Sequence, residues 1–161
     1  MMQGRVYAVT FENVTVSAAQ ELFEISPADD KPVELVGLFL SNVGGTADAG
    51  DAQEEFLRLN VIRGYTASGS GGSAPTPTPL GPNDTASGFA AEVNNTTVAN
   101  TGTAVNCHTD GFNIRTGYQL WWPPEARPAA SQANTTIVVR LVGAPADAVA
   151  MSGTLYVREL N

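Results

Sequence analysis

The chain contains one thiol and one imidazole, and they are neighbours in the sequence. Cys107 and His108 are followed two positions later by the carboxylate of Asp110. A thiol, an imidazole and a carboxylate are the parts of a nucleophile, base and orienting acid. Adjacent side chains on an extended strand point to opposite faces, however, and catalytic cysteine–histidine pairs are normally assembled from distant positions. We therefore expect a polar loop here, and a protein that is not an enzyme.

Other polar stretches do not complete a metal or cofactor site. A single histidine and a single cysteine exclude multi-histidine cradles and cysteine-based zinc chelation by this chain alone. The acidic pairs Asp29-Asp30 and Glu54-Glu55 are typical of solvated loops, and residues 48–51 are too sparse in oxygen ligands for a calcium loop. The glycines of 69–72 lack the lysine and the helix of a phosphate loop. We expect no cofactor and no metal.

Composition excludes several classes of partner. The formal net charge is −8, and the eight basic residues are scattered, whereas phosphate binding needs them gathered on one face. No window approaches 18 apolar residues, and the N-terminus lacks a secretion signal, so we expect no membrane span and a product folded in a reducing cytoplasm. Charged residues make up only 15% of the chain, against roughly 25% in typical soluble domains. This sparse charge indicates extensive contact with other protein.

Alternating and β-branched runs predict short strands at regular spacing. The expected strands are 5–16 with a break at 12–13, 21–25, 33–41, 56–65, 89–93, 135–142 and 152–160. Two further pieces, 112–114 and 118–122, flank Thr116-Gly117 and form either a hairpin or one strand bent by a glycine bulge. With about eight to ten strands and no long helix, the expected fold is one all-β domain over 1–161, an antiparallel, jelly-roll-like sandwich.

Residues 66–88 interrupt this pattern with a long loop. A flexible SGSGGS run leads into PTPTPLGP, which is stiff and polyproline-like. Such a composition cannot pack a core, and loops of this length are usually functional or disordered. The sequence leaves two alternatives open, a solvent-exposed spacer and an arm that lies over a neighbouring subunit.

The stretch 111–128 carries both tryptophans and ends its apolar run in Trp121-Trp122-Pro123-Pro124. Proline cannot donate to a strand ladder, so the pattern is typical of a strand leaving a sheet. Adjacent tryptophans face opposite sides, so we expect one in the core and the other exposed or against a partner. Alternatively both anchor the core, or one stacks on sugar. The interface candidates are Tyr118, Trp121, Trp122, Arg127, Tyr65, Pro75, Pro77 and Pro79.

Four segments together resemble a group of small β-rich proteins of tailed bacteriophages and prophages that serve as head decoration or cement proteins. They are SGSGGSAPTPTPLG, AEVNNTT, GYQLWWPPEARP and the terminal MSGTLYVREL, and the similarity spans most of the chain. The resemblance supplies no catalytic residues. It implies a structural virion protein on the capsid exterior, a homotrimer that bridges subunits of the major capsid protein.

Three functions from different classes follow. The first is the non-enzymatic, capsid-stabilising protein, which agrees with low charge and a long Gly/Pro-rich arm. The second is a carbohydrate- or receptor-binding head in which an exposed Trp121 or Trp122 stacks against sugar. The third and weakest is a hydrolase that uses His108 with an acid.

Overall fold

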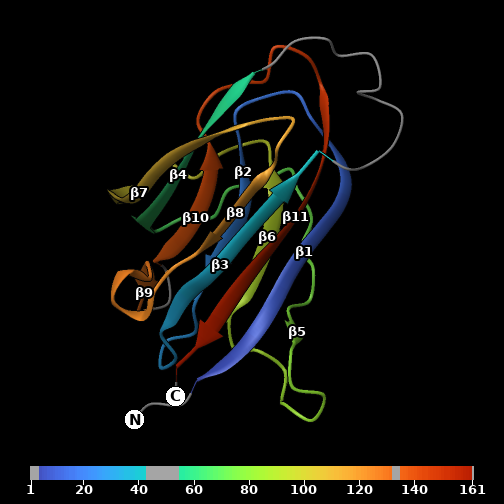
Figure 1. The fold of residues 1–161 in the computed structure, drawn as a ribbon. Coiled ribbons are helices and arrows are strands. Elements are labelled where there is room, and N and C mark those ends of the chain that lie inside the picture. The colour runs from blue at the N-terminus through green and yellow to red at the C-terminus, as the bar shows by residue number, and fades with distance from the viewer. Residues whose placement is uncertain (1–3, 43–54, 132–134, 161) are drawn as a thin grey trace.

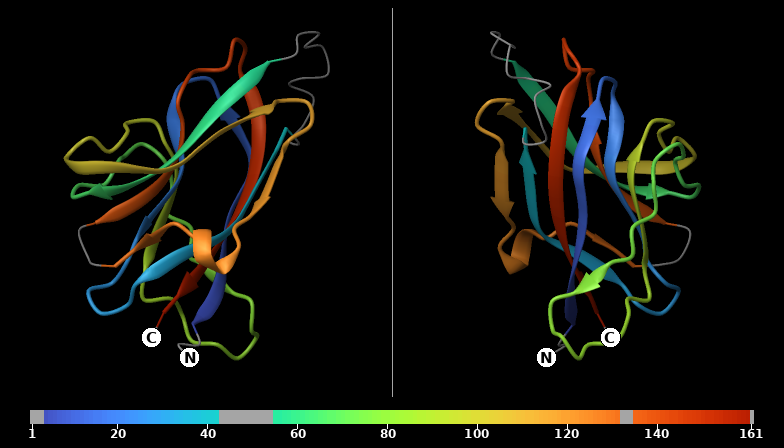
Figure 2. Two further views of the ribbon diagram at one scale, coloured as in Figure 1. Left: turned by 60° about the vertical axis from the view of Figure 1, so that its left-hand side comes forward. Right: turned by 90° about the vertical axis from the view of Figure 1, so that its right-hand side faces the viewer.

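The chain folds into two antiparallel β-sheets packed face to face, as the computed structural model shows (Figures 1 and 2). The structure describes residues 4–42, 55–131 and 135–160. No α-helix occurs in these ranges. The elements are β1 (Arg5–Val16), β2 (Gln20–Ser26), β3 (Val33–Ser41), β4 (Phe56–Tyr65), β5 (Thr78–Pro79), β6 (Ala90–Asn95), β7 (Gly102–Asn113), β8 (Tyr118–Trp121), the 3-10 helix η2 (Pro124–Ala126), β9 (Ala129–Ala130), β10 (Thr136–Leu141) and β11 (Val149–Glu159).

The strand order is that of a jelly roll. The first sheet has the order β5-β1-β11-β3-β8, with β9 also pairing β3, and the second has the order β6-β2-β10-β4-β7. The long strands form nested pairs, β1 with β11, β2 with β10, β3 with β8 and β4 with β7, and each pair lies in the opposite sheet from the pair before it. This is a long hairpin wrapped into a sandwich, and it confirms the expected fold class.

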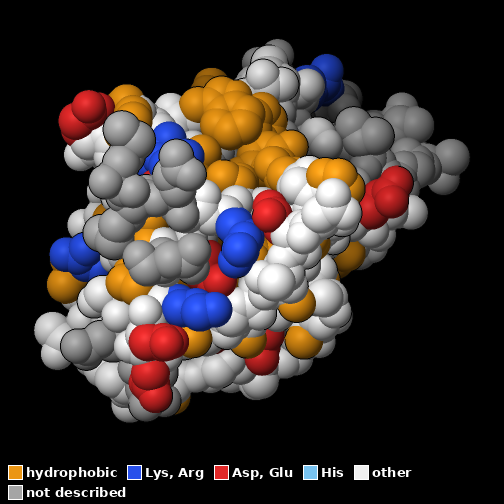
Figure 3. Space-filling view, turned by 90° about the horizontal axis from the view of Figure 1, so that it is seen from below, with side chains coloured by type: hydrophobic (Ala, Val, Ile, Leu, Met, Phe, Trp, Pro, Cys, Tyr) orange, Lys and Arg blue, Asp and Glu red, His pale blue; other side chains and the backbone are white. Residues whose placement is uncertain are grey.

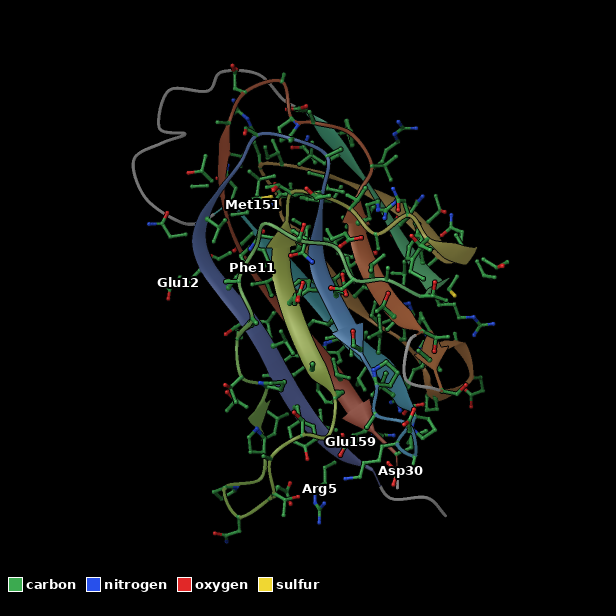
Figure 4. All side chains as sticks on the ribbon, turned by 180° about the vertical axis from the view of Figure 1, so that it is seen from behind. Arg5, Phe11, Glu12, Asp30, Met151 and Glu159 are labelled. Atoms are coloured by element: carbon green, nitrogen blue, oxygen red, sulfur yellow. The ribbon has the colours of Figure 1, made fainter. Side chains whose placement is uncertain are left out.

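The core lies between the two sheets and is built by side-chain alternation. On β11, Leu155 and Val157 point inward and are fully buried, whereas Thr154 and Tyr156 point outward. The predicted break in 5–16 is confirmed as a register shift in β1 between Phe11 and Val14. Figure 4 shows that Phe11 and Glu12, just before this shift, lie on opposite sides of the strand.

The predictions around Thr116-Gly117 were wrong in both alternatives. β7 and β8 lie in different sheets, so the connection between them crosses from one layer to the other and forms neither a hairpin nor one bent strand. The polar loop expected at residues 106–110 is also wrong, because this stretch is the middle of β7. β7 is an edge strand whose side chains are largely exposed on both faces, so it lacks the apolar alternation that predicts a strand.

The segment 66–88 lies along the chain's own sandwich. Ser70 forms a bridge with Thr97, and Ser73 forms one with Val93 of β6. Further along, β5 pairs with β1 in the other sheet, and the Leu80 N–H donates to the Val6 carbonyl over 3.0 Å. The segment therefore spans from one sheet to the other at the edge of the sandwich.

Candidate functional site

The two adjacent tryptophans point to opposite sides of β8 and its end. The Trp122 side chain is 5% exposed and belongs to the core, where its indole meets the His108 ring edge to face at 5.7 Å. The Trp121 side chain is 58% exposed on the outer face of the first sheet. The prediction that one tryptophan enters the core while the other does not is thus confirmed.

Trp121 belongs to an aromatic platform, made of Phe39, Trp121 and Tyr156, on the outer face of the first sheet. The Trp121 and Tyr156 rings are stacked, with 5.3 Å between centroids and 9° between planes. Phe39 meets both rings edge to face, at 5.1 Å and 5.8 Å. These rings come from three neighbouring strands, β8, β3 and β11. Figure 3 shows hydrophobic side chains gathered toward one rim of the molecule when it is seen from below.

Gly37 makes this platform possible. It lies between Trp121 and Tyr156 in the strand register, on β3. A Cβ atom at this position would lie only 2.6 Å from Cε3 of Trp121. Because Gly37 has no side chain, the indole can extend across β3 to reach the tyrosine on β11. Sequence reasoning missed this role, although a lone glycine inside an apolar strand is a signal of close approach.

A charged group borders the aromatic platform along the same strands. The Glu34 Oε1 atom accepts hydrogen bonds from Nη1 of Arg127 at 2.7 Å and from Nη1 of Arg158 at 3.1 Å. Arg127 also donates from Nε to the Trp122 carbonyl. This candidate interface residue therefore fixes the chain that leaves β8, and it is mostly buried.

A hollow of about 570 Å³ adjoins the platform at Phe39, and we call it the side groove. Its lining comes from β1, β3, β8 and β11 and combines the apolar side chains of Phe11, Phe39 and Leu40 with polar ones. The lining side chains with polar groups are Thr10, Glu12, Ser41, Gln119, Ser152 and Thr154. Among the described residues that line this hollow, Glu12 is the ionisable one.

The remaining interface candidates offer little surface. Tyr118, Tyr65 and Pro77 are buried, and Pro75 and Pro79 are half-buried. Tyr65 lies in a small apolar cluster on the outer face of the second sheet, under the Arg140 guanidinium. Of the eight candidates, Trp121 is the exposed one. The interface role of the set stays a prediction.

His108 and Asp110 are brought together, but with a tyrosine and without an activated nucleophile. The Tyr118 hydroxyl donates to Oδ2 of Asp110 over 2.9 Å, and Nε2 of His108 lies 3.3 Å from the same hydroxyl. Burial, and then the Asp110 carboxylate, raise the pKa of Tyr118, while the Gly111 N–H and the Tyr118 hydroxyl lower the pKa of Asp110. The hydroxyl therefore keeps its proton. The Cys107 thiol donates to the Val105 carbonyl instead of meeting the imidazole.

The four sheet edges differ in how they are covered. The edge strands of the first sheet are short, since β5 has two residues and β8 has four. In the second sheet, Ser73 forms an isolated β-bridge with Val93 and so pairs with part of the outer edge of β6. β7 has 12 residues, and no other described strand pairs with its far side. Its register with β4 is uninterrupted from Asn113 to His108. Such an edge is a template for pairing with another chain.

A second polar group, which sequence reasoning missed, lies under the Gly-rich segment on the outer face of the second sheet. We call it the carboxylate cluster: Glu21, Glu24, Glu92, Asn95 and Arg140. The Asn95 Nδ2 atom lies 2.8–3.4 Å from Oε2 of all three glutamates. The Arg140 Nη2 atom donates to Oε1 of Glu21 at 3.0 Å and to the Ala99 carbonyl.

The covering segment, residues 66–73, is attached to this cluster. The Gly69 N–H donates to Oε2 of Glu24 at 2.9 Å, and the Ser68 hydroxyl donates to Oε2 of Glu92 at 3.2 Å. Burial raises the pKa of Glu24. The hydrogen bonds from Ser68 and Gly69 lower this pKa, the neighbouring Glu21 raises it, and the net shift is upward. The cluster binds the chain's own loop.

Comparisons with known proteins identify no relative: no family model, no curated protein and no solved structure matches the chain. In the described ranges, no group of three histidine, cysteine or acidic residues is arranged to hold a metal ion. Within the same ranges, no helix has the length and apolar character needed to cross a membrane.

Proposed function

We propose that the chain is a non-enzymatic structural protein of a tailed-phage virion. In this role it binds the outside of the capsid as a homotrimer and stabilises contacts between subunits of the major capsid protein. The resemblance of four sequence segments to head decoration proteins supports this role, as does the jelly-roll fold, which is common in virion proteins.

The open edge of β7 is the observation that carries the proposal. Isolated proteins usually protect long edge strands with lysine, proline or a covering loop, because an open edge pairs with other chains. The run His108–Asn113 contains no lysine or proline, no described loop covers it, and it keeps a regular register, so that Asp110 is its one charged side chain besides the imidazole. An extended segment of a capsid subunit that adds to this run would bind through main-chain hydrogen bonds.

The geometry of the ladder identifies which groups such a segment would meet. The Ile114 N–H donates to the Glu55 carbonyl at 2.9 Å. Backbone groups alternate along a strand, so those of Phe112, Asp110 and His108 face β4, and those of Thr109 and Gly111 face away. The Gly111 N–H is already taken by the Asp110 carboxylate at 2.8 Å. Thr109 therefore offers the central outward N–H.

The test uses capsids of the encoding phage or prophage assembled without this protein. Purified chain should co-sediment with these particles, at a trimer per binding site, and should raise their disruption temperature. Many weak contacts repeated on a symmetric lattice add up to stable attachment. If the chain does not bind the particles and does not raise their disruption temperature, the proposed function is contradicted.

A matched pair of variants tests the role of the edge. Thr109→Pro removes the outward N–H without removing a bond to β4, and we expect it to weaken capsid binding by about tenfold or more. Both substitutions remove the Thr109 hydroxyl, which accepts a hydrogen bond from Nδ2 of Asn106. Thr109→Val keeps the backbone N–H, however, and should bind like the wild type. Equal binding by the two variants would show that the capsid contact lies elsewhere.

A further inference from the structure

The aromatic platform presents an open ring on the outer face of the first sheet. Trp121 stacks on Tyr156 through one ring face, and Phe39 contacts it through an edge. The indole is nevertheless 58% exposed, so its opposite face is open to a ligand. Gly37 beneath it and Tyr156 beside it restrict how the indole can lie. Little order would have to be gained when a ligand binds to it.

The side groove supplies the second half of a binding site. It begins at Phe39, the ring that also borders Trp121, so that the two features are continuous. Its volume of about 570 Å³ lies within the range of small-molecule sites, roughly 300–1,000 Å³. Hydroxyl groups of Thr10, Ser41 and Thr154 and the amide of Gln119 line it. These groups donate and accept, as the hydroxyls of a sugar also do.

We propose that this face binds a neutral oligosaccharide. One pyranose ring would stack its C–H face on the Trp121 indole, and the next unit would place its hydroxyls against Gln119 and Thr154 in the side groove. The half-exposed indole offers a face for stacking, and the hydroxyl and amide groups beside it offer hydrogen bonds. This combination matches the C–H face and the hydroxyls of a sugar ring.

Charge selects the class of sugar. Among the described residues that line the side groove, Glu12 is the ionisable one, and the chain carries a net charge of −8. A carboxylate repels a second anion, so sialic and uronic acids are disfavoured there. Arg127 and Arg158 share the single Glu34 carboxylate and therefore keep one surplus positive charge, but Glu34 lies five residues before Phe39 on β3, at the end of the platform away from the side groove. This proposal does not rest on the capsid role, since the outward groups of β7 belong to the other sheet.

The experiment is an array of immobilised neutral and acidic bacterial polysaccharides and of neutral and acidic hexose oligosaccharides. The purified chain should bind neutral probes, at least about tenfold more tightly than acidic ones. Titration of the best neutral probe should then show a loss of about tenfold or more for Trp121→Ala, the equivalent of about 1.4 kcal/mol. Trp121→Phe keeps a ring and should lose less.

Two more variants keep the proposal falsifiable. Gln119→Leu keeps the shape of the side groove and removes its amide, and it should also weaken binding. Phe56→Ala removes another exposed aromatic ring, which is 76% exposed on β4 of the other sheet, and should bind like the wild type. Circular dichroism and thermal melting check that each variant is folded. Absence of binding to every neutral probe, or equal binding by wild type and folded Trp121→Ala, overturns the proposal.

Discussion

The outer faces of the two sheets are treated in opposite ways. On the second sheet, the chain covers its own face with residues 66–73, which donate hydrogen bonds to the buried carboxylate of Glu24 and the half-buried carboxylate of Glu92. On the first sheet, the aromatic platform stays open, and its rings contact one another instead of a covering loop. One face is therefore closed by polar groups, and the other is left open with apolar ones.

This difference follows from the cost of burying backbone. A Gly- and Ser-rich loop brings few apolar atoms, so it must satisfy its N–H groups on the surface that it covers. The carboxylate cluster provides acceptors for this purpose. Three carboxylates around one amide leave a surplus of negative charge, which Arg140 and the raised pKa of Glu24 reduce. An open face needs no such acceptors and can keep exposed rings for a ligand.

Removing Arg140 should have the largest effect on the covered face. Glu21 is fully buried and its ion pair with Arg140 measures 3.0 Å, so Arg140→Met leaves a buried carboxylate without its cation. Such losses cost about 3–5 kcal/mol of unfolding free energy. Urea unfolding measures the change. The control is Arg5→Met, whose pair with Asp84 is exposed and should cost under about 1 kcal/mol.

A second variant separates the charge effect from a packing effect. Glu21→Gln in the Arg140→Met background removes the uncompensated charge, and it should recover part of the lost stability. If the double variant is no more stable than Arg140→Met, the pairing with Glu21 is not the source of the loss.

Replacing Glu24 should have a smaller effect of the opposite sign. A carboxyl whose pKa is raised in the folded state contributes stability that is present at low pH and is lost as pH rises through the folded pKa. Glu24→Gln removes this loss and keeps an oxygen that can accept from the Gly69 N–H. We expect a gain of about 1 kcal/mol at pH 8 and no gain near pH 4. Thermal melting across this range measures it, and a gain independent of pH would contradict the explanation.

Gly37→Ala should have the smallest effect on stability, and it tests the open face. The added Cβ must displace the Trp121 indole, which lies on the surface and can move outward, so the cost should stay under about 1 kcal/mol. The displaced indole should become more accessible to acrylamide quenching. Gly143→Ala is the matched control, because a Cβ there meets no atom within 4 Å. Unchanged quenching in Gly37→Ala would show that the glycine does not position the platform.

Much of the fold could be predicted because most long strands have one face in the core. The bounds 33–41 and 56–65 agree with β3, which is buried or half-buried along its whole length, and with β4, where buried residues mostly alternate with more exposed ones. Of β7, only the end at Phe112 and Asn113 was predicted as strand, because a strand at an open edge has no face that must be apolar along its whole length. For this reason the polar stretch around Cys107 and His108 predicts a loop, whereas the structure has a strand there.

The candidate site was predictable only in its local part. Alternation places Trp121 and Trp122 on opposite faces, and the sequence shows that directly. The stacking of Trp121 on Tyr156 depends on strand order, which brings β8, β3 and β11 together and which local pattern does not encode. The carboxylate cluster was hidden for the same reason, since Glu21 and Glu92 meet only after β2 pairs with β6.

The nested order of strands also has a consequence for the speed of folding. The outermost pair joins Arg5 to Glu159, whereas the innermost pair, β4 with β7, already encloses the whole Gly/Pro-rich segment. Each pairing therefore closes a long loop before its contacts form, and chains dominated by such non-local pairings fold in milliseconds to seconds, not microseconds. Until β1 and β11 meet, the edges of the inner strands stay open, so that folding and unwanted association compete during this interval.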